Sequence, residues 1–153
     1  ITHILLWYIF NINNMVVKKL KRILLIFFSS LLILGACGKE YSVSDVTDQF
    51  KKDGLKVQNL HKMSREDFGV APMKAEEAKM FTVKDDKNAR IMKFKNEDEL
   101  KDTKKYYDEL GKSSAAFYSH TYAKDNILIQ MNGEIKEDVF NKYKDSMKKV
   151  LDQ

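Results

Sequence analysis

The chain has 153 residues, enough for one domain, and a formal net charge of +5. Four of its 27 basic residues but none of its 22 acidic residues precede Cys37, so the part beyond Cys37 carries a net charge of only +1. Because nucleic-acid-binding domains present clustered basic surfaces, these interleaved charges argue against a nucleic-acid partner. The single cysteine excludes an internal disulfide and any multi-cysteine metal site.

The first 36 residues have the character of a precursor segment. Residues 1–14 begin with Ile and fit no targeting signal, and we interpret them as an over-extended gene start. Residues 15–36 begin at Met15 with a basic stretch and continue with an apolar run from Ile23 to Ile33. A basic start followed by a short apolar run is typical of a signal peptide, since spanning a bilayer takes about 20 apolar residues.

The segment Leu34-Gly35-Ala36-Cys37 closes this signal. It resembles the lipobox of bacterial lipoprotein precursors, in which Leu, two small residues and Cys occupy these places. The resemblance implies cleavage between Ala36 and Cys37, a diacylglyceryl cysteine at residue 37 and a domain held on the extracytoplasmic face of the cell membrane. It leaves open whether the new amino group is also acylated, for example with palmitate. The alternative is an uncleaved signal anchor with an inert thiol.

Residues 37–41 are predicted to be the lipidated cysteine and a short tether, and residues 42–153 a single exported domain. Its helices and strands are predicted from the spacing of apolar residues and from the Gly, Pro and Asn residues that interrupt them. In the first half we expect a helix from Ser42 to Gly54, a strand over 55–61, a helical turn over 64–68, another over 74–79, and strands over 80–84 and 89–95.

The second half has clearer signals. Asn96, followed three residues later by Glu99, predicts a helix start, with the end of the helix at Gly111. Strands are expected over 115–122 and 127–131. Apolar residues at helical spacing then predict a C-terminal helix; they are Ile135, Val139, Tyr143, Met147 and Val150 or Leu151. This order predicts an α+β domain, a mainly antiparallel sheet with helices packed largely on one face.

The stretch from Tyr106-Tyr107 through Ser119-His120 to Asn132-Gly133 is similar to small uncharacterised cell-surface lipoproteins of Gram-positive bacteria. The resemblance covers most of residues 42–151. It implies a compact fold and a cell-surface setting, and it assigns no catalytic residue.

The exported part lacks the familiar catalytic motifs. It contains no Gly-x-Ser-x-Gly elbow, His-Glu-x-x-His motif or phosphate-binding glycine loop, so we expect no enzyme, no catalytic residue and no cofactor. A copper or haem site could recruit His61, Met63, His120 and Met131. We favour the interpretation that the methionines fill the core and that there is no metal.

One group of side chains stands out as a candidate ligand contact. Tyr118, His120 and Tyr122 alternate along a predicted strand, so they should share one face of it. Two tyrosines beside a histidine can stack on a flat ligand, and they can equally form an ordinary packed layer.

These observations predict a membrane-anchored cell-envelope lipoprotein with a small non-enzymatic binding domain. Its partners would be the membrane, through Cys37, and an unidentified envelope protein or small ligand. Two alternatives stay open: an exclusion or immunity lipoprotein of a mobile element, and an envelope enzyme without a recognisable motif.

Overall fold

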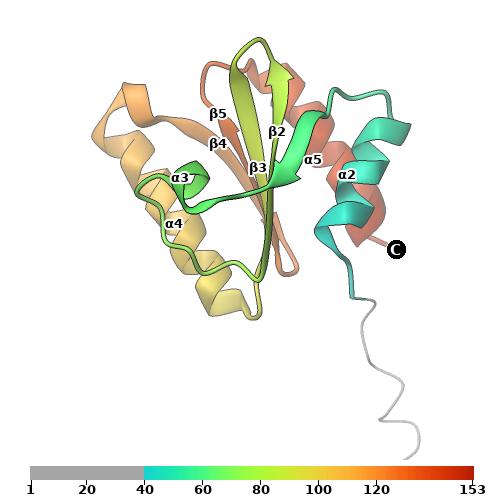
Figure 1. Ribbon diagram of the computed structural model, residues 1–153, viewed down its shortest axis with the longest axis horizontal. Coiled ribbons are helices and arrows are strands. Elements are labelled where there is room, and N and C mark those ends of the chain that lie inside the picture. Colours follow the sequence, from blue (N-terminus) through green and yellow to red (C-terminus); the bar gives the residue numbers. More distant parts are fainter. Residues whose placement is uncertain (1–39) are drawn as a thin grey trace, which may run out of the picture. The chain divides into compact units, whose positions relative to one another are not determined.

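A computed structural model describes residues 40–153, and residues 41–153 form one compact unit (Figure 1). The predictions for the gene start, the signal peptide, Ala36 and Cys37 concern residues outside the described part. Among residues 40–153, no helix is both long and apolar enough to cross a membrane.

Five strands form a single antiparallel sheet in the order β1-β2-β3-β5-β4. This arrangement confirms the predicted α+β class and the antiparallel sheet. The elements in chain order are α2 (Val43–Lys52), β1 (Gln58–Lys62), α3 (Arg65–Phe68), β2 (Glu77–Lys84), β3 (Lys87–Lys93), α4 (Glu97–Ser113), the 3₁₀ turn η2 (Ala115–Phe117), β4 (Ser119–Lys124), β5 (Ile127–Asn132) and α5 (Glu137–Leu151).

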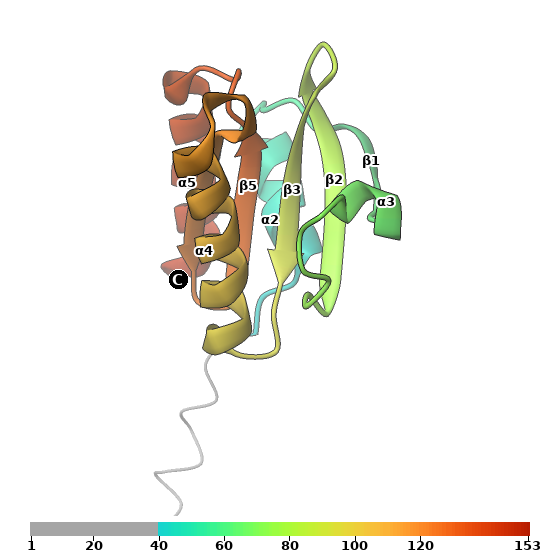
Figure 2. The same cartoon turned by 90° about the vertical axis from the view of Figure 1, so that its left-hand side faces the viewer.

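The helices are divided between the two faces of the sheet rather than gathered largely on one. Helices α2 and α5 cover one face, and α4 with the one-turn α3 covers the other (Figure 2). The central strands require this cover because they are apolar on both faces. Ile91 and Ile129 point towards α5, whereas Met92 and Leu128 point towards α4, and all four side chains are fully buried.

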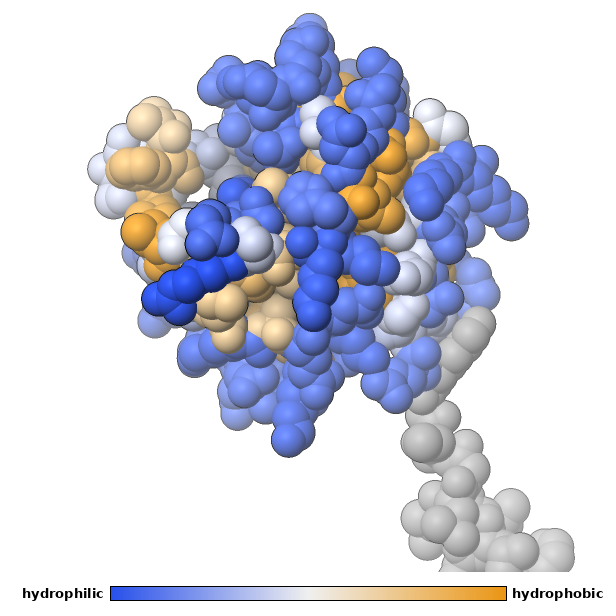
Figure 3. All heavy atoms as spheres, in the orientation of Figure 1, coloured by the Kyte–Doolittle hydropathy of each residue, from blue (hydrophilic) through white to orange (hydrophobic). Residues whose placement is uncertain are grey.

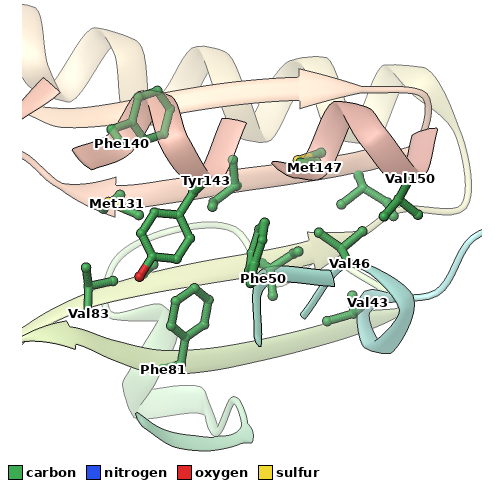
Figure 4. Close-up of a cluster of buried hydrophobic side chains, with 14 of the residues drawn as sticks. Val43, Val46, Phe50, Phe81, Val83, Met131, Phe140, Tyr143, Met147 and Val150 are labelled. Carbon is green, nitrogen blue, oxygen red and sulfur yellow. The ribbon is translucent and has the colours of Figure 1, made fainter. Parts of the chain in front are cut away.

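The core on the α5 face is built around three aromatic rings. Phe50 of α2 lies edge-on to Tyr143 of α5, with 5.1 Å between ring centroids, and both rings contact Phe81 of β2 at 6.0 Å (Figure 4). Edge-on and tilted rings at these separations attract each other beyond the effect of area burial. The triad therefore joins α2, α5 and the sheet.

Capping side chains determine where most of the helices begin. Ser42 and Asp45 form a capping box at α2, and the Asn96 side chain accepts from the Glu99 N–H at α4. The helical turn predicted over 74–79 is wrong, because Glu77 begins β2 and pairs with Lys93 of β3. Pairing on both sides of β2 overrides the weak local helix preference.

Candidate functional site

A cleft opens where four segments meet on the α5 side of the sheet. Its volume is about 350 Å³. The α2–β1 connection, the end of β2, the β5–α5 turn and the first turns of α5 each contribute side chains. We call it the basic cleft; it is lined by Gly54, Leu55, Lys56, Val83, Lys84, Glu134, Ile135, Lys136, Val139, Lys142 and Tyr143.

The floor of the basic cleft is apolar. Val83, Ile135 and Tyr143 are buried, and Leu55 and Val139 are partly exposed and pack against the same core. Figure 3 shows apolar surface between hydrophilic side chains at the upper right, over the region where β1 and α5 lie in Figure 1. This floor offers contact to an apolar part of a ligand.

The rim of the basic cleft is positively charged. Lys56, Lys84, Lys136 and Lys142 are exposed, and none of them forms an ion pair with any residue in the range 40–153. The carboxylate in the lining, Glu134, instead pairs with Lys87 at 3.1 Å. Glu137 and Asp138 begin α5 nearby but do not line the cleft. The lining therefore carries several uncompensated positive charges.

Tyr143 fixes one wall of the basic cleft. Its hydroxyl donates a hydrogen bond of 2.7 Å to the carbonyl oxygen of Lys56, which ties α5 to the α2–β1 connection. Only 2% of Tyr143 is exposed, and this burial raises the pKa of its phenol to about 12. The phenol is therefore neutral at physiological pH and adds no charge to the lining.

The three residues predicted as ligand contacts occupy different positions in the fold, although the Tyr118 hydroxyl lies 3.3 Å from His120 Nδ1. The strand predicted over 115–122 begins only at Ser119, so Tyr118 precedes β4 and follows the η2 turn. His120 and Tyr122 lie on the α5 face, paired with Met131 and Ile129 of β5. Tyr118 packs so closely on Gly133 that a methyl group there would clash with the Tyr118 carbonyl oxygen and lie 2.6 Å from Tyr118 Cδ1.

His120 is held entirely by protein groups. It is buried, its ring stacks on Phe140 at 4.9 Å, and its Nε2 lies 2.7 Å from the carbonyl oxygen of Ile135. Since a carbonyl only accepts, Nε2 carries the proton, and Nδ1 is the acceptor for the Tyr118 hydroxyl at 3.3 Å. Both ring nitrogens are occupied, which gives His120 a packing role.

Tyr122 is also partly covered. The ammonium groups of Lys144 and Lys148 lie 5.5 and 5.8 Å from the centre of its ring, on the side of α5. Cation–π contacts of this kind hold a ring against a helix surface. Tyr118 lines two cavities on the α4 side of the sheet.

Among the described residues, His61 and His120 are too far apart to share a metal ion. His61 lies on β1 and His120 on β4, which are the two opposite edges of the sheet. Met63 belongs to the core on the α4 side, whereas Met131 belongs to the core on the α5 side. Within residues 40–153, no group of three or more His, Cys, Asp or Glu side chains is placed to hold a metal.

Sequence reasoning missed the basic cleft. Its four lysines are separated by 28, 52 and 6 residues along the chain, so no local motif marks them. Val139 gave no signal either, because it fits the predicted apolar stripe of the C-terminal helix and only the structure leaves it partly exposed at the cleft. Comparison of the chain with protein-family models, with curated proteins and with solved structures finds no match.

Proposed function

We propose that this protein is a lipid-anchored component of the bacterial cell envelope whose domain binds a small amphipathic anion in the basic cleft. The anchor is Cys37, modified with a diacylglyceryl group and placed at the extracytoplasmic face of the membrane. The domain acts by binding and not by catalysis. The observation that carries the proposal is the combination of an apolar floor with four unpaired lysines in one cleft of about 350 Å³.

The chemistry of the lining supports an amphipathic ligand. Small-molecule sites are mostly apolar with a few polar groups that fix orientation, and volumes from about 300 Å³ are typical of them. Lysine ammonium groups at the rim would attract a carboxylate or phosphate group, while Leu55, Val83 and Val139 would contact an alkyl or ring portion. The lining includes no histidine, serine or cysteine, which favours binding over nucleophilic catalysis.

A calorimetric titration of residues 41–153 with decanoate and with decanol tests the proposed ligand class. We expect saturable binding of decanoate and binding of decanol at least tenfold weaker. The double change Lys56→Gln and Lys142→Gln should weaken decanoate binding at least threefold and leave decanol unaffected. Lys105→Gln is the matched control, because Lys105 is an exposed lysine of α4 outside the cleft. Equal binding of both probes, or of neither, would contradict the proposal.

The anchor is tested separately in cells that express the full chain. Cys37→Ala should abolish incorporation of labelled fatty acid and release the protein from the membrane fraction. Retention of label in the Cys37→Ala variant would rule out lipidation at this residue and leave the calorimetric result untouched.

A further inference from the structure

A second cavity lies on the opposite face of the sheet, beside the C-terminal half of α4. Its volume is about 220 Å³, and it opens next to Phe117 and Tyr118, which are 61% and 49% exposed. We call it the polar cavity. The side chains that matter for its chemistry are Arg90 of β3, Tyr107 of α4, Ser119 of β4 and Gln130 of β5.

Two hydroxyl groups in the polar cavity are unpaired. Tyr107 and Ser119 are only 8% and 9% exposed, and within residues 40–153 neither Tyr107 Oη nor Ser119 Oγ has a hydrogen-bond partner. An unpaired buried hydroxyl costs folding free energy, so each such group in a native protein calls for an explanation. Both hydroxyls lie in the lining of the same cavity, so one ligand could satisfy both.

The guanidinium of Arg90 is held in place without a counter-ion. Its Nε donates to the carbonyl oxygen of Asp67 at 2.9 Å, and its Nη1 donates to Gln130 Oε1 at 2.8 Å. Arg90 forms no ion pair with any carboxylate of the described chain. The carboxylate that lines the cavity, Asp86, pairs with Lys87 at 3.2 Å. Two of the five guanidinium N–H groups are used in these bonds, so one N–H of Nη1 and both of Nη2 are left to donate to a ligand.

We propose that the polar cavity binds the carboxylate or phosphate group of a small molecule, with Arg90 supplying the positive charge and the Tyr107 and Ser119 hydroxyls donating hydrogen bonds. A guanidinium restrained at two of its nitrogens loses little freedom when it binds an oxyanion. The exposed rings of Phe117 and Tyr118 would contact the remainder of the ligand. The polar cavity and the basic cleft lie on opposite faces of the sheet, so this inference is independent of the proposed function.

The test uses the full chain in a non-ionic detergent, with inorganic phosphate and benzoate as probes in calorimetric titrations. We expect saturable binding of at least one probe. Arg90→Gln should weaken that binding at least tenfold, and Tyr107→Phe at least threefold. Lys105→Gln is the control and should leave the affinity for both probes unchanged, because Lys105 is an exposed lysine of α4 that lines neither the polar cavity nor the basic cleft.

The melting temperature without probe supplies a second readout. Tyr107→Phe removes only an unpaired hydroxyl, so it should leave the melting temperature unchanged or raise it while it weakens binding. This variant keeps the test decisive even if Arg90→Gln fails to fold. The proposal is overturned if neither probe binds saturably, if Tyr107→Phe leaves probe affinity unchanged, or if it lowers the melting temperature and thereby shows that the hydroxyl has a structural partner.

Discussion

Tyr143 and Tyr107 are both buried tyrosines on long helices, and they face opposite sides of the same sheet. The Tyr143 hydroxyl is bonded to the carbonyl of Lys56, whereas the Tyr107 hydroxyl has no partner in the described chain. Burial raises the pKa of both phenols. Unpaired buried hydroxyls occur on both faces, because Ser146 Oγ of α5 also lacks a hydrogen-bond partner among residues 40–153. The α4 face differs in that two such hydroxyls, those of Tyr107 and Ser119, line one cavity. Where a fold departs from local consistency, a ligand-binding role is the first explanation to test.

The apolar cores on the two faces of the sheet differ in size. The core on the α5 face contains 17 buried residues and the one on the α4 face contains nine, so most of the stabilising burial lies under α2 and α5. On the α4 face, polar side chains occupy three neighbouring strands in register, since Gln130 pairs with both Arg90 and Thr121. The α5 face therefore supplies most of the buried apolar packing, whereas the α4 face combines a smaller apolar core with buried polar side chains.

Truncating a ring in each core should have the largest effect. Phe50→Ala should cost about 3–5 kcal/mol of unfolding free energy, because Phe50 is fully buried. Phe94→Ala, a fully buried ring on the α4 face, should cost about 1 kcal/mol less, because Phe50 also loses contacts with Phe81 and Tyr143. Urea unfolding of residues 41–153 measures both. A greater loss for Phe94→Ala would reverse the ranking of the two faces.

Alkaline pH should weaken the α5 face through Tyr143. Its pKa is about 12 in the folded protein and 10.0 in an unperturbed tyrosine, so the folded state favours the neutral phenol. This contribution, about 2–3 kcal/mol, is fully present below pH 10 and is lost as the pH rises through about 12. Urea unfolding at a series of pH values should show the decline, with a shallower decline in Tyr143→Phe. Parallel curves for the two proteins would contradict the assignment.

Removing one hydroxyl from each face should change stability in opposite directions. Tyr143→Phe leaves the Lys56 carbonyl without its donor and should cost about 1 kcal/mol. Tyr107→Phe should be neutral or stabilising by up to about 1 kcal/mol, since no bond is lost. Thermal unfolding monitored by circular dichroism distinguishes the two signs. Destabilisation of equal size in both variants would remove the contrast between the faces.

The smallest effect is expected at the exposed surface of α4. Lys101 and Glu97 form an i,i+4 ion pair of 2.9 Å, and both side chains are more than 60% exposed. Pairs of this kind contribute at most about 0.5 kcal/mol to the free energy of unfolding, so Lys101→Gln should change stability very little. The pair should also weaken with added salt. A larger loss in urea unfolding would mean that α4 depends on its surface charges more than on its packing.

The α+β class and the order of the main elements followed from local sequence patterns. The cap at Asn96 predicted α4, and the spacing of Tyr143 and Met147 predicted α5; the structure confirms both helices. Caps and the spacing of apolar residues depend only on residues close together in the sequence, so they can be recognised without the structure. Element ends were less well predicted. Gly111 lies inside α4, which continues to Ser113, and β4 starts at Ser119 after a 3₁₀ turn.

The tertiary structure alone decided which side chains meet. The predicted stripe on the C-terminal helix placed Val139 in the core, yet it lines the basic cleft, and Phe140 is the buried neighbour that stacks on His120. The cleft and the polar cavity each draw residues from segments that lie far apart in the sequence. Their composition depends on strand order and on helix placement over each face, which arise from long-range pairing and packing that no local spacing encodes.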